Sequence, residues 1–521
     1  MSARFDLEDD DVAVIVGSGA GGATLANELS GLGLKTIVLE AGRELTLGDI
    51  DNDEVGMAVK VGWLDKRLPG TNPLGAPQPM PYMAKAVGGT TILWGAVAAR
   101  FLAHDFHVRS TYGSVADANL LDWPISLAEL EPYYARAEKK LGVTGTAASG
   151  LPLLPENNHY KVLAAGARTV GYRRIIRPLA INSAGYDGRP ACQQIGFCQS
   201  GCRIGAKWSA FYTEIRRALA SGRTELRPNA MALSIAHDRR GRVSGVMYCD
   251  AQGARHVQKA RIVCVAGNSV ESPRLLLNSR SAMFPNGLAN SSGQVGRNYM
   301  THTSAFSFAV HRKPVYMYRG TTLSAIIADE TIPNPDRGFF GGYHLEGLAL
   351  GLPFAASNIH PGGWGRELTS ALDAYDNMSL IWICGEDLPR EGNAVTLHPT
   401  ERDAYGLPVP IVAKSDHAND TRMRRHAWDQ SRKIAEAVGA RRVLESIPTG
   451  NGHNMGTNRM SAKSSDGVVN QWGQSHDIKN LFVSDGSQFT SSSAANPTLT
   501  IVALAIRQAE FIGRSAKTRA I

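Results

Sequence analysis

The stretch that decides the fold is residues 11–42, DVAVIVGSGAGGATLANELSGLGLKTIVLEAG. Residues 12–16 are a short apolar run, and residues 34–39 form a second strand-like run that ends on Glu40. Runs of this kind are typical of buried parallel strands. Between them stand a glycine-rich turn and a segment with small apolar residues at helical spacing. This order of strand, glycines, helix, strand and acid predicts a βαβ unit that binds a dinucleotide.

Three glycines of the turn have separate predicted roles. Gly17 makes the tight turn, Gly19 lets the backbone approach a pyrophosphate, and Gly22 lets the helix pack closely on the strand. The pyrophosphate then lies at Ala20, where the free N–H groups and the positive dipole end of the helix converge. Glu40 can accept hydrogen bonds from both ribose hydroxyls. These residues indicate FAD or NAD without separating the two.

Composition sets the limits for the rest of the chain. With 521 residues, of which 43% are hydrophobic, it can bury a large core and should hold two or more structural units. The net charge of +8 is spread thinly, so we expect no nucleic-acid partner. No apolar run is long enough to span a bilayer. The N-terminus, MSARFDLEDDD, lacks the regions of a signal peptide, which predicts a cytoplasmic location; export to the periplasm bound to a partner that carries a signal stays open.

A second pair of glycines opens the segment GGTTILW at residues 88–94. Paired glycines followed by hydroxyl residues suggest a backbone laid against a ligand. Near the C-terminus, residues 481–483 form a predicted strand whose end would place the next residues over the cofactor, and a proline opens the last helix. The cofactor contacts expected in these segments are Gly88, Gly89, Thr90, Thr91, Trp94, Asp485, Gly486, Asn496, Pro497 and Thr498.

Together with residues 453–460, HNMGTNRM, these segments resemble the glucose-methanol-choline (GMC) family of FAD-dependent oxidoreductases, from the first strand to the last helix. The resemblance implies FAD and an α/β fold, in which a Rossmann-like FAD-binding domain carries a second, α+β substrate domain built on an antiparallel sheet. In related flavoenzymes a histidine near residues 91–94 bonds covalently to the flavin. The side chains here, TILW, cannot form that bond, which implies non-covalent FAD.

The sequence of residues 122–143, DWPISLAELEPYYARAEKKLGV, resembles that of the large subunits of bacterial FAD sugar and gluconate dehydrogenases. The family pattern also implies a division of the chain. The expected parts are 1–105 (FAD-binding), 106–187 (substrate or cap region), 188–300 (FAD-binding, with a cysteine loop), 301–447 (substrate-binding) and 448–521 (FAD-binding, with the catalytic residues).

Three of the six cysteines, Cys192, Cys198 and Cys202, stand in a C-x5-C-x3-C spacing among glycines. Thiolates so close could ligate an iron-sulfur cluster, and three ligands suit a 3Fe-4S centre. The large subunits named above carry a similar arrangement, which would pass electrons from flavin to a cytochrome. Related flavoenzymes without a cluster also keep cysteine loops here. A packed loop with inert thiols therefore stays open beside the cluster.

The resemblance assigns the chemistry to two residues. In the family, a histidine of the HxxGTxRM segment and a His or Asn before Pro-Thr meet at the flavin face, and these positions are His453 and Asn496. The implied mechanism is that His453 takes the hydroxyl proton while the carbinol hydride passes to the flavin, and that Asn496 hydrogen-bonds the same oxygen. From the residues alone, Asn496 could instead be the N-cap of the last helix.

Several functions remain open at this point. The first is oxidation of a CH–OH group of a sugar, sugar acid, glycoside or polyol, with electrons passed to a carrier and with a small subunit and a cytochrome c as partners. The second is an oxidase or dehydrogenase of another alcohol that uses O2 or another acceptor. The third is a flavin electron-transfer subunit without a substrate site. An NAD enzyme is a weaker fourth, since no nicotinamide motif appears.

The rest of the chain is expected to contain a helix at residues 208–219 and a long helix at residues 421–438, with Arg422, Arg424 and Arg425 on its solvated face. Residues 43–83 show no sustained period and are expected to form a long loop. The substrate domain is expected to be one antiparallel sheet that includes strands at residues 305–310, 379–384, 394–398 and 409–412.

Overall fold

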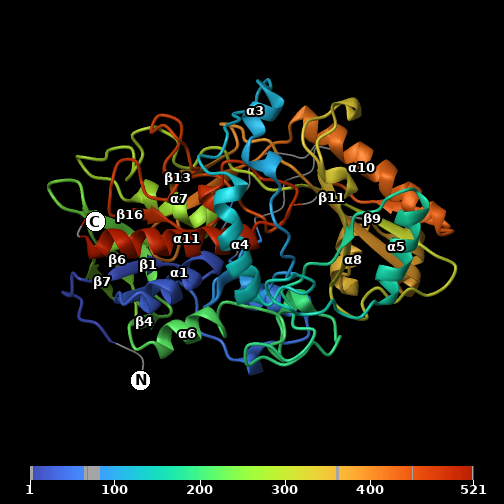
Figure 1. The fold of residues 1–521 in the computed structure, drawn as a ribbon, viewed down its shortest axis with the longest axis horizontal. Helices are drawn as coiled ribbons and strands as arrows, with labels where there is room; N and C mark the ends of the chain where they lie inside the picture. Colours follow the sequence, from blue (N-terminus) through green and yellow to red (C-terminus); the bar gives the residue numbers. More distant parts are fainter. Residues whose placement is uncertain (1–3, 64–66, 68–81, 360–362, 449, 519) are drawn as a thin grey trace.

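The computed structural model describes residues 4–63, 67, 82–359, 363–448, 450–518 and 520–521. The two main sheets lie in opposite halves of the molecule (Figure 1). In the left half a parallel sheet carries helices α1, α7 and α11, and in the right half an antiparallel sheet carries α5 and α10. The predicted fold class, an FAD-type parallel domain with a second antiparallel domain, is confirmed.

The parallel sheet has five strands gathered from distant parts of the chain. All of its neighbours pair in parallel. Its core residues, such as Ile15, Val38 and Val263, are fully buried, as expected for strands covered on both faces. In spatial order the strands are β16 (Leu481–Val483), β8 (Ile262–Val265), β1 (Ala13–Val16), β2 (Thr36–Leu39) and β4 (Thr224–Arg227).

Helices pack on this sheet because their apolar faces need cover. Helix α1 (Ala20–Gly31) follows β1 directly, as the βαβ pattern predicts, and lies along α11 (Thr498–Lys517). Helix α4 (Leu127–Leu141) packs on α11 in turn, and its N-terminus has the predicted capping box of Ser126 and Glu129. The other elements of this half are α6 (Glu214–Ala220), α7 (Asn268–Asn278) and the antiparallel sheet of β5 (Met231–His237), β6 (Val243–Cys249) and β7 (Arg255–Lys259).

The six-stranded sheet separates two environments by simple alternation of side chains. On one face Ala305, Leu345 and Ile383 pack under α5 (Asn158–Thr169) and α10 (Ala418–Ala437). The neighbouring residues of the same strands point to the other face, toward the parallel domain. In order the strands are β15 (Arg442–Glu445), β9 (Thr303–Val310), β12 (Met378–Gly385), β11 (Tyr343–Leu348), β10 (Leu323–Ile327) and β3 (Ile175–Ile176).

Several local predictions were wrong. The strands predicted at 394–398 and 409–412 form a separate pair, β13 (Ala394–Arg402) and β14 (Pro408–Ala413), outside the six-stranded sheet. Arg424 is not solvated, because it is 3% exposed and its guanidinium binds Asp416 at 2.8 Å. The helix predicted from residue 208 begins only at Glu214.

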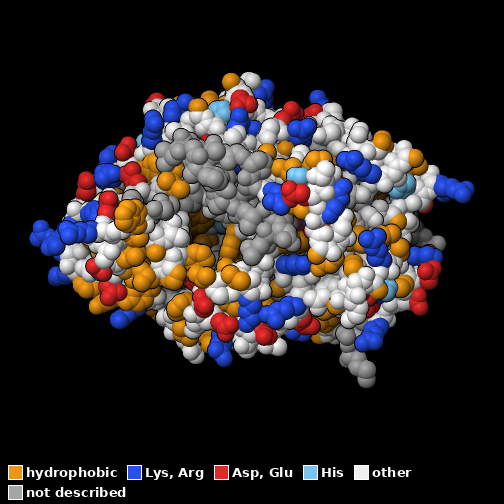
Figure 2. Space-filling model, turned by 180° about the vertical axis from the view of Figure 1, so that it is seen from behind, with side chains coloured by type: hydrophobic (Ala, Val, Ile, Leu, Met, Phe, Trp, Pro, Cys, Tyr) orange, Lys and Arg blue, Asp and Glu red, His pale blue; other side chains and the backbone are white. Residues whose placement is uncertain are grey.

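The predicted loop at residues 43–83 contains helix α2 (Glu54–Val61), and residues 64–66 and 68–81 of it lie outside the described residues. The remaining helices are α3 (Val108–Tyr112), α8 (Leu352–Ile359) and α9 (Gly365–Asp373). Among the described helices none combines the length and the apolar character needed to cross a bilayer. On the face drawn in Figure 2, basic and acidic side chains are interspersed, and hydrophobic side chains border a central hollow.

Candidate active site

The candidate functional residues line one cavity of about 490 Å³. Gly17, Gly19 and Glu40 lie in its wall, and so do His453 and Asn496. A cavity of this size is within the usual range for small-molecule and cofactor sites, about 300–1,000 Å³. Residues from the first strand turn and from the start of the last helix therefore face the same space.

Ser18 connects the segments that form the nucleotide end of the cavity. Its hydroxyl donates to Oε2 of Glu40 at 2.6 Å and accepts the N–H of Gly88 at 2.9 Å. The N–H of Ser18 donates to the same carboxylate at 3.0 Å, and the N–H of Gly42 donates to Oε1 at 2.8 Å. Burial raises the pKa of Glu40, and these hydrogen bonds oppose the shift. The protein thus fixes this carboxylate in the wall, where its remaining lone pairs can accept from a ribose.

Steric contacts show which glycines of the turn the backbone requires. A Cβ on Gly17 would lie 2.4 Å from the carbonyl oxygen of Ala266, and a Cβ on Gly21 would lie 1.6 Å from that of Ser484. Gly21, which the dinucleotide motif does not single out, is therefore more crowded than Gly17. A Cβ on Gly19 would meet nothing within 4 Å. The space beside Gly19 is open, which fits the close approach of a cofactor pyrophosphate.

Most residues predicted to contact the cofactor lie in the cavity wall. Gly22 and Gly88 are not among the described lining residues. A Cβ on Gly22 would lie 2.1 Å from the carbonyl oxygen of Gly17, and one on Gly88, whose φ is +98°, would lie 2.7 Å from Cβ of Phe211, so both glycines serve packing. The predicted residues that do line the cavity are Gly17, Gly19, Ala20, Glu40, Gly89, Thr90, Thr91, Trp94, Asp485, Gly486, Asn496, Pro497 and Thr498.

Asp485 is held by three donors. The N–H groups of Asn268 and Ser487 each donate to its carboxylate at 2.8 Å, and the hydroxyl of Ser272 donates at 2.5 Å. Because Asn268 is the first residue of α7, the carboxylate lies at the positive end of that helix. Burial raises the pKa of Asp485 against these bonds. Through these contacts Asp485 joins the end of β16 to the start of α7 in the cavity wall.

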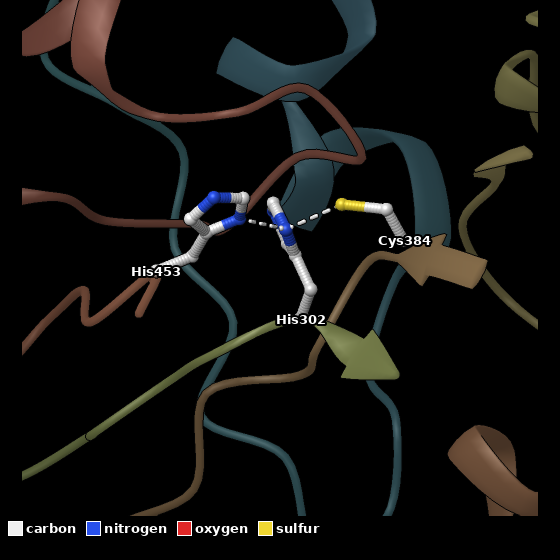
Figure 3. Close-up of side chains that lie close together, drawn as sticks. All are labelled: His302, Cys384 and His453. Atoms are coloured by element: carbon white, nitrogen blue, oxygen red, sulfur yellow. Dashed lines mark hydrogen bonds between the residues drawn. The ribbon is translucent and has the colours of Figure 1, made fainter. Parts of the chain in front are cut away.

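At the other end of the cavity, His453 belongs to a group of three side chains from separate elements (Figure 3). Nδ1 of His302, just before β9, lies 2.8 Å from Nδ1 of His453 and 2.7 Å from Sγ of Cys384 on β12. The two imidazole rings meet edge to face, with centroids 4.8 Å apart, and the ring of Trp382 packs on His453 at 5.2 Å. The predicted base is therefore fixed in orientation by its neighbours.

This geometry assigns the protons of the pair. Burial and the neighbouring Glu346 carboxyl raise the pKa of Cys384, so its thiol is protonated and can donate. Nε2 of His302 has no hydrogen-bond partner among the described residues, whereas its Nδ1 faces both the thiol of Cys384 and Nδ1 of His453. We propose that Nδ1 of His302 is the acceptor of these contacts, which places a proton on Nδ1 of His453. Its Nε2 then carries the lone pair that a general base needs.

Backbone contacts bring these residues together. Met300 and Met455 exchange two N–H···O bonds, at 3.0 and 2.9 Å, which sets the His302 segment beside the His453 segment. The side chain of Asn451 then accepts the N–H of His453 at 2.9 Å and donates to the carbonyl of His302 at 3.1 Å. Desolvation lowers the pKa of His453 to about 4 and holds that of His302 well below its ordinary value. Both rings are thus neutral at neutral pH.

Asn496 is not the N-cap of the last helix, so that alternative was wrong. The cap position of α11 is Pro497, and no side chain bonds to the first turn. Asn496 is 4% exposed, and its Oδ1 has no hydrogen-bond partner among the described residues. A buried amide oxygen of this kind is costly unless a ligand satisfies it. Asn496 therefore lies in the cavity wall with an unpaired amide oxygen, which can accept a hydrogen bond from a bound cofactor or substrate.

The substrate end of the cavity was missed by sequence reasoning. Its wall comes from the inner face of the six-stranded sheet, with Phe306 on β9, Trp382 on β12 and Glu346 on β11. The indole N–H of Trp382 already donates to Ser304 at 2.6 Å, so the tryptophan offers the cavity an apolar ring. The sequence signal for these residues is the alternation of side chains along each strand. This alternation separates the two faces of the sheet but does not identify the face that lines the cofactor cavity.

Hydrogen bonds from Lys207 join the cysteine loop to the segment at residues 88–94. The Nζ of Lys207 is buried and donates to the carbonyls of Ile92, Trp94 and Cys198 at 2.8, 2.8 and 2.5 Å. Burial lowers the pKa of Lys207 to about 8. Burial also raises the pKa of Cys192 to about 11, with a further contribution from the nearby Cys198 and Cys202. All three thiols are free of disulfides.

Comparison with known proteins identifies this arrangement. Residues 11–304 and residues 389–505 match two family models described as GMC oxidoreductase. The chain belongs to the GMC oxidoreductase family. It is therefore an FAD-dependent oxidoreductase that acts on alcohol groups. The open space at Gly19 and the orphaned oxygen of Asn496 fit a cofactor held between the two ends of the cavity.

Alignments with similar proteins cover nearly the whole length of this chain. 2-Methyl-1,2-propanediol dehydrogenase of Mycolicibacterium austroafricanum is 31% identical, with 99% of this chain and 96% of that protein covered. The fructose dehydrogenase large subunit of Gluconobacter japonicus is 29% identical, with 96% and 97% covered. Paromamine 6'-oxidase of Streptomyces fradiae is also 29% identical, with 98% and 93% covered.

Solved structures agree on the fold. The crystal structure of pyridoxine 4-oxidase from Mesorbium loti superposes with a TM-score of 0.67 at 17% identity, covering 97% of this chain and 99% of that one. A structure of Aspergillus oryzae formate oxidase, solved to study modification of its FAD, gives a TM-score of 0.68 at 14% identity. The superposition covers 99% of this chain and 100% of that one. At such low identity the likeness concerns the fold alone.

Proposed function

We propose that this GMC oxidoreductase oxidises a CH–OH group of a sugar, sugar acid, glycoside or polyol and passes the electrons to a carrier. The observation that carries the proposal is one cavity lined by Glu40 and the glycine turn together with His453 and Asn496. The names of similar proteins support a substrate with several hydroxyl groups, since they include a diol dehydrogenase, a fructose dehydrogenase and a paromamine oxidase.

In the proposed reaction, Nε2 of His453 accepts the proton of the substrate hydroxyl. The low pKa of this imidazole, about 4, keeps its lone pair available at neutral pH. The amide N–H of Asn496 donates to the same oxygen and orients the carbinol carbon. FAD would supply the acceptor for the carbinol hydride. His302 accepts a hydrogen bond from the Nδ1–H of His453 throughout, so the base keeps the tautomer that the reaction needs.

We further propose that the FAD is held without a covalent bond. The segment Thr91-Ile92-Leu93-Trp94 offers no histidine, and its hydroxyl is engaged, since Oγ1 of Thr91 donates to the carbonyl of Gly88 at 2.6 Å. Denaturation with acid should therefore release all the yellow colour into the supernatant. Colour that stays with the precipitated protein would contradict this part of the proposal.

An anaerobic screen of sugars, polyols and alcohols against the flavin absorbance tests the main proposal. A productive substrate should bleach the wild-type flavin, and His453→Ala should keep the flavin bound but lose most of the reduction rate, because a positioned base is worth about 10²- to 10⁴-fold. His107→Gln, an exposed histidine outside the described cavity wall, is the matched control. Absence of bleaching by every alcohol would leave only the electron-transfer alternative.

An oxidase is the second candidate, because similar proteins also include oxidases. The two candidates differ only in how the reduced flavin is reoxidised. Once a substrate is known, rapid oxygen consumption without an added dye would favour the oxidase. Slow oxygen consumption together with fast dye reduction would favour the dehydrogenase.

For the cysteine loop we propose the 3Fe-4S cluster as a hypothesis, with inert thiols as its alternative. Each sulfur accepts a backbone N–H, from Gln194, Thr322 and Lys207 at 3.4 to 3.5 Å, and hydrogen bonds to sulfur are common around such clusters. About three iron atoms per chain after anaerobic purification would support the cluster. Iron-free, fully active protein would contradict the cluster.

A further inference from the structure

Glu346 is a buried acid in the cavity wall that the proposed chemistry does not use. It lies on β11, directly opposite Trp382 of β12, on the sheet face that forms the substrate end of the cavity. Its exposed fraction is 0%, and neither carboxylate oxygen makes a hydrogen bond of normal geometry with a described residue. A carboxylate buried in this way is costly unless something pairs with it.

The neighbours of Glu346 do not satisfy it. The nearest basic atom, Nδ1 of His344, lies 3.9 Å from Oε1, too far for a hydrogen bond, and the one donor beside the carboxyl is the thiol of Cys384, a weak donor that Glu346 shares with His302. The other acids of the cavity wall differ. Glu40 receives three donors and Asp485 also receives three. Glu346 is therefore unlike the acids that only hold the fold together.

The charge of the cavity narrows what could bind there. Among the described residues of its wall the only Lys or Arg is Arg274, whose guanidinium pairs with Glu271 at 3.1 Å and with Asp403 at 2.7 Å. A negatively charged substrate would thus meet the Glu346 carboxylate without an available cationic partner in the described wall. Around Glu346 the wall is apolar, with Phe306 and Leu348 beside it, so water competes little for the carboxylate.

We propose that Glu346 binds a hydrogen-bond donor of the substrate, a hydroxyl or an ammonium group, at a carbon remote from the one that is oxidised. This inference rests on the proposed function and narrows it: the substrate is a neutral or amino-substituted polyol or sugar, and sugar acids are disfavoured. A bound donor satisfies the buried carboxylate, while Trp382 and Phe306 cover the carbon skeleton. Glu346 is then the residue that selects among alcohols, and His453 acts on whichever carbinol that contact positions.

The test compares analogues of the best alcohol from the anaerobic screen. In three analogues the remote hydroxyl is kept, replaced by an amino group, or replaced by hydrogen, and a fourth carries a carboxylate there. Flavin reduction by each is measured in the wild type, in Glu346→Gln and in Glu346→Leu. Glu436→Gln, an exposed acid on α10, is the matched control.

Wild type should prefer the donor analogues over the deoxy analogue by about tenfold to a hundredfold in kcat/KM, the usual worth of a hydrogen bond to a charged group. Glu346→Gln should lose most of the amino preference and less of the hydroxyl preference, because an amide oxygen still accepts. It should also accept the carboxylate analogue better than wild type does. Glu346→Leu should abolish both preferences.

Equal changes with all four analogues, or no change with any, would overturn the assignment. Retained flavin absorbance and an unchanged unfolding temperature show that a variant is folded, and Glu346→Gln, which is nearly isosteric, carries the test if the leucine variant is unstable. Failure of the proposed function is distinguishable, because then no alcohol would bleach even the wild-type flavin.

Discussion

Nδ1 of His453 lies 2.8 Å from Nδ1 of His302, although the two residues are 151 positions apart in the chain. One of the two nitrogens must donate and the other accept. The thiol of Cys384 lies 2.7 Å from the same nitrogen of His302, and we propose that this nitrogen is the acceptor. In that arrangement the lone pair of His453 lies on Nε2, the nitrogen that remains for a substrate.

The first prediction concerns this contact. His302→Leu should slow flavin reduction by about tenfold to a hundredfold, because a buried N–H of His453 loses its acceptor at a cost of about 1–3 kcal/mol. His302→Gln should recover much of the rate, since an amide oxygen can accept the same proton. The measurement is the anaerobic rate of flavin reduction at saturating substrate. Equal rates in the two variants would show that His302 only fills space.

The second prediction concerns pH. A base is active when it is unprotonated, so the rate is full above its pKa and falls as the pH drops through it. Burial lowers the pKa of His453 to about 4 from its ordinary value of 6.5. Flavin reduction should therefore stay nearly constant from pH 8 down to about pH 5 and fall only below that. A midpoint near 6.5 would mean that this imidazole is solvated or is not the base.

The third prediction separates the two roles considered for Asn496. Asn496→Ala should reduce the rate of flavin reduction by about tenfold or more, because the substrate oxygen loses one hydrogen bond. The unfolding temperature should change little, since the side chain does not cap α11. Loss of a cap typically costs about 1 kcal/mol. A lower unfolding temperature with an unchanged rate would contradict the assignment.

The fourth prediction uses two glycines of one turn. Gly19→Ala should fold normally, because a Cβ there meets no protein atom within 4 Å, but should bind FAD poorly, because the methyl group enters the space of the pyrophosphate. Gly21→Ala should be destabilised, since its Cβ would lie 1.6 Å from the carbonyl oxygen of Ser484. Flavin content and thermal unfolding of both variants check this. Full flavin content in Gly19→Ala would show that the cofactor lies elsewhere.

The sequence by itself determined the parallel domain. A run of apolar residues, a glycine turn and an amphipathic helix are local patterns, and each one restricts its own backbone whatever surrounds it. The βαβ unit from β1 to β2, strand β16 and helix α11 were accordingly found where expected. Site residues that occupy fixed positions in a sequence motif, such as His453 and Glu40, could be predicted for the same reason. The motifs taken together indicated the family.

Only the tertiary structure decided what surrounds His453. His302 precedes β9, Cys384 lies on β12 and Glu346 lies on β11. Their meeting depends on the register of these strands, in which Ser304 pairs with Cys384 and Glu346 with Trp382. No local pattern encodes that register, because it is set by long-range packing of the sheet under α5 and α10. The burial of Arg424 and the separation of β13 and β14 from the sheet have the same origin. Contacts between residues distant in sequence, rather than the motifs, thus set the tautomer of the base and the charge of the substrate cavity.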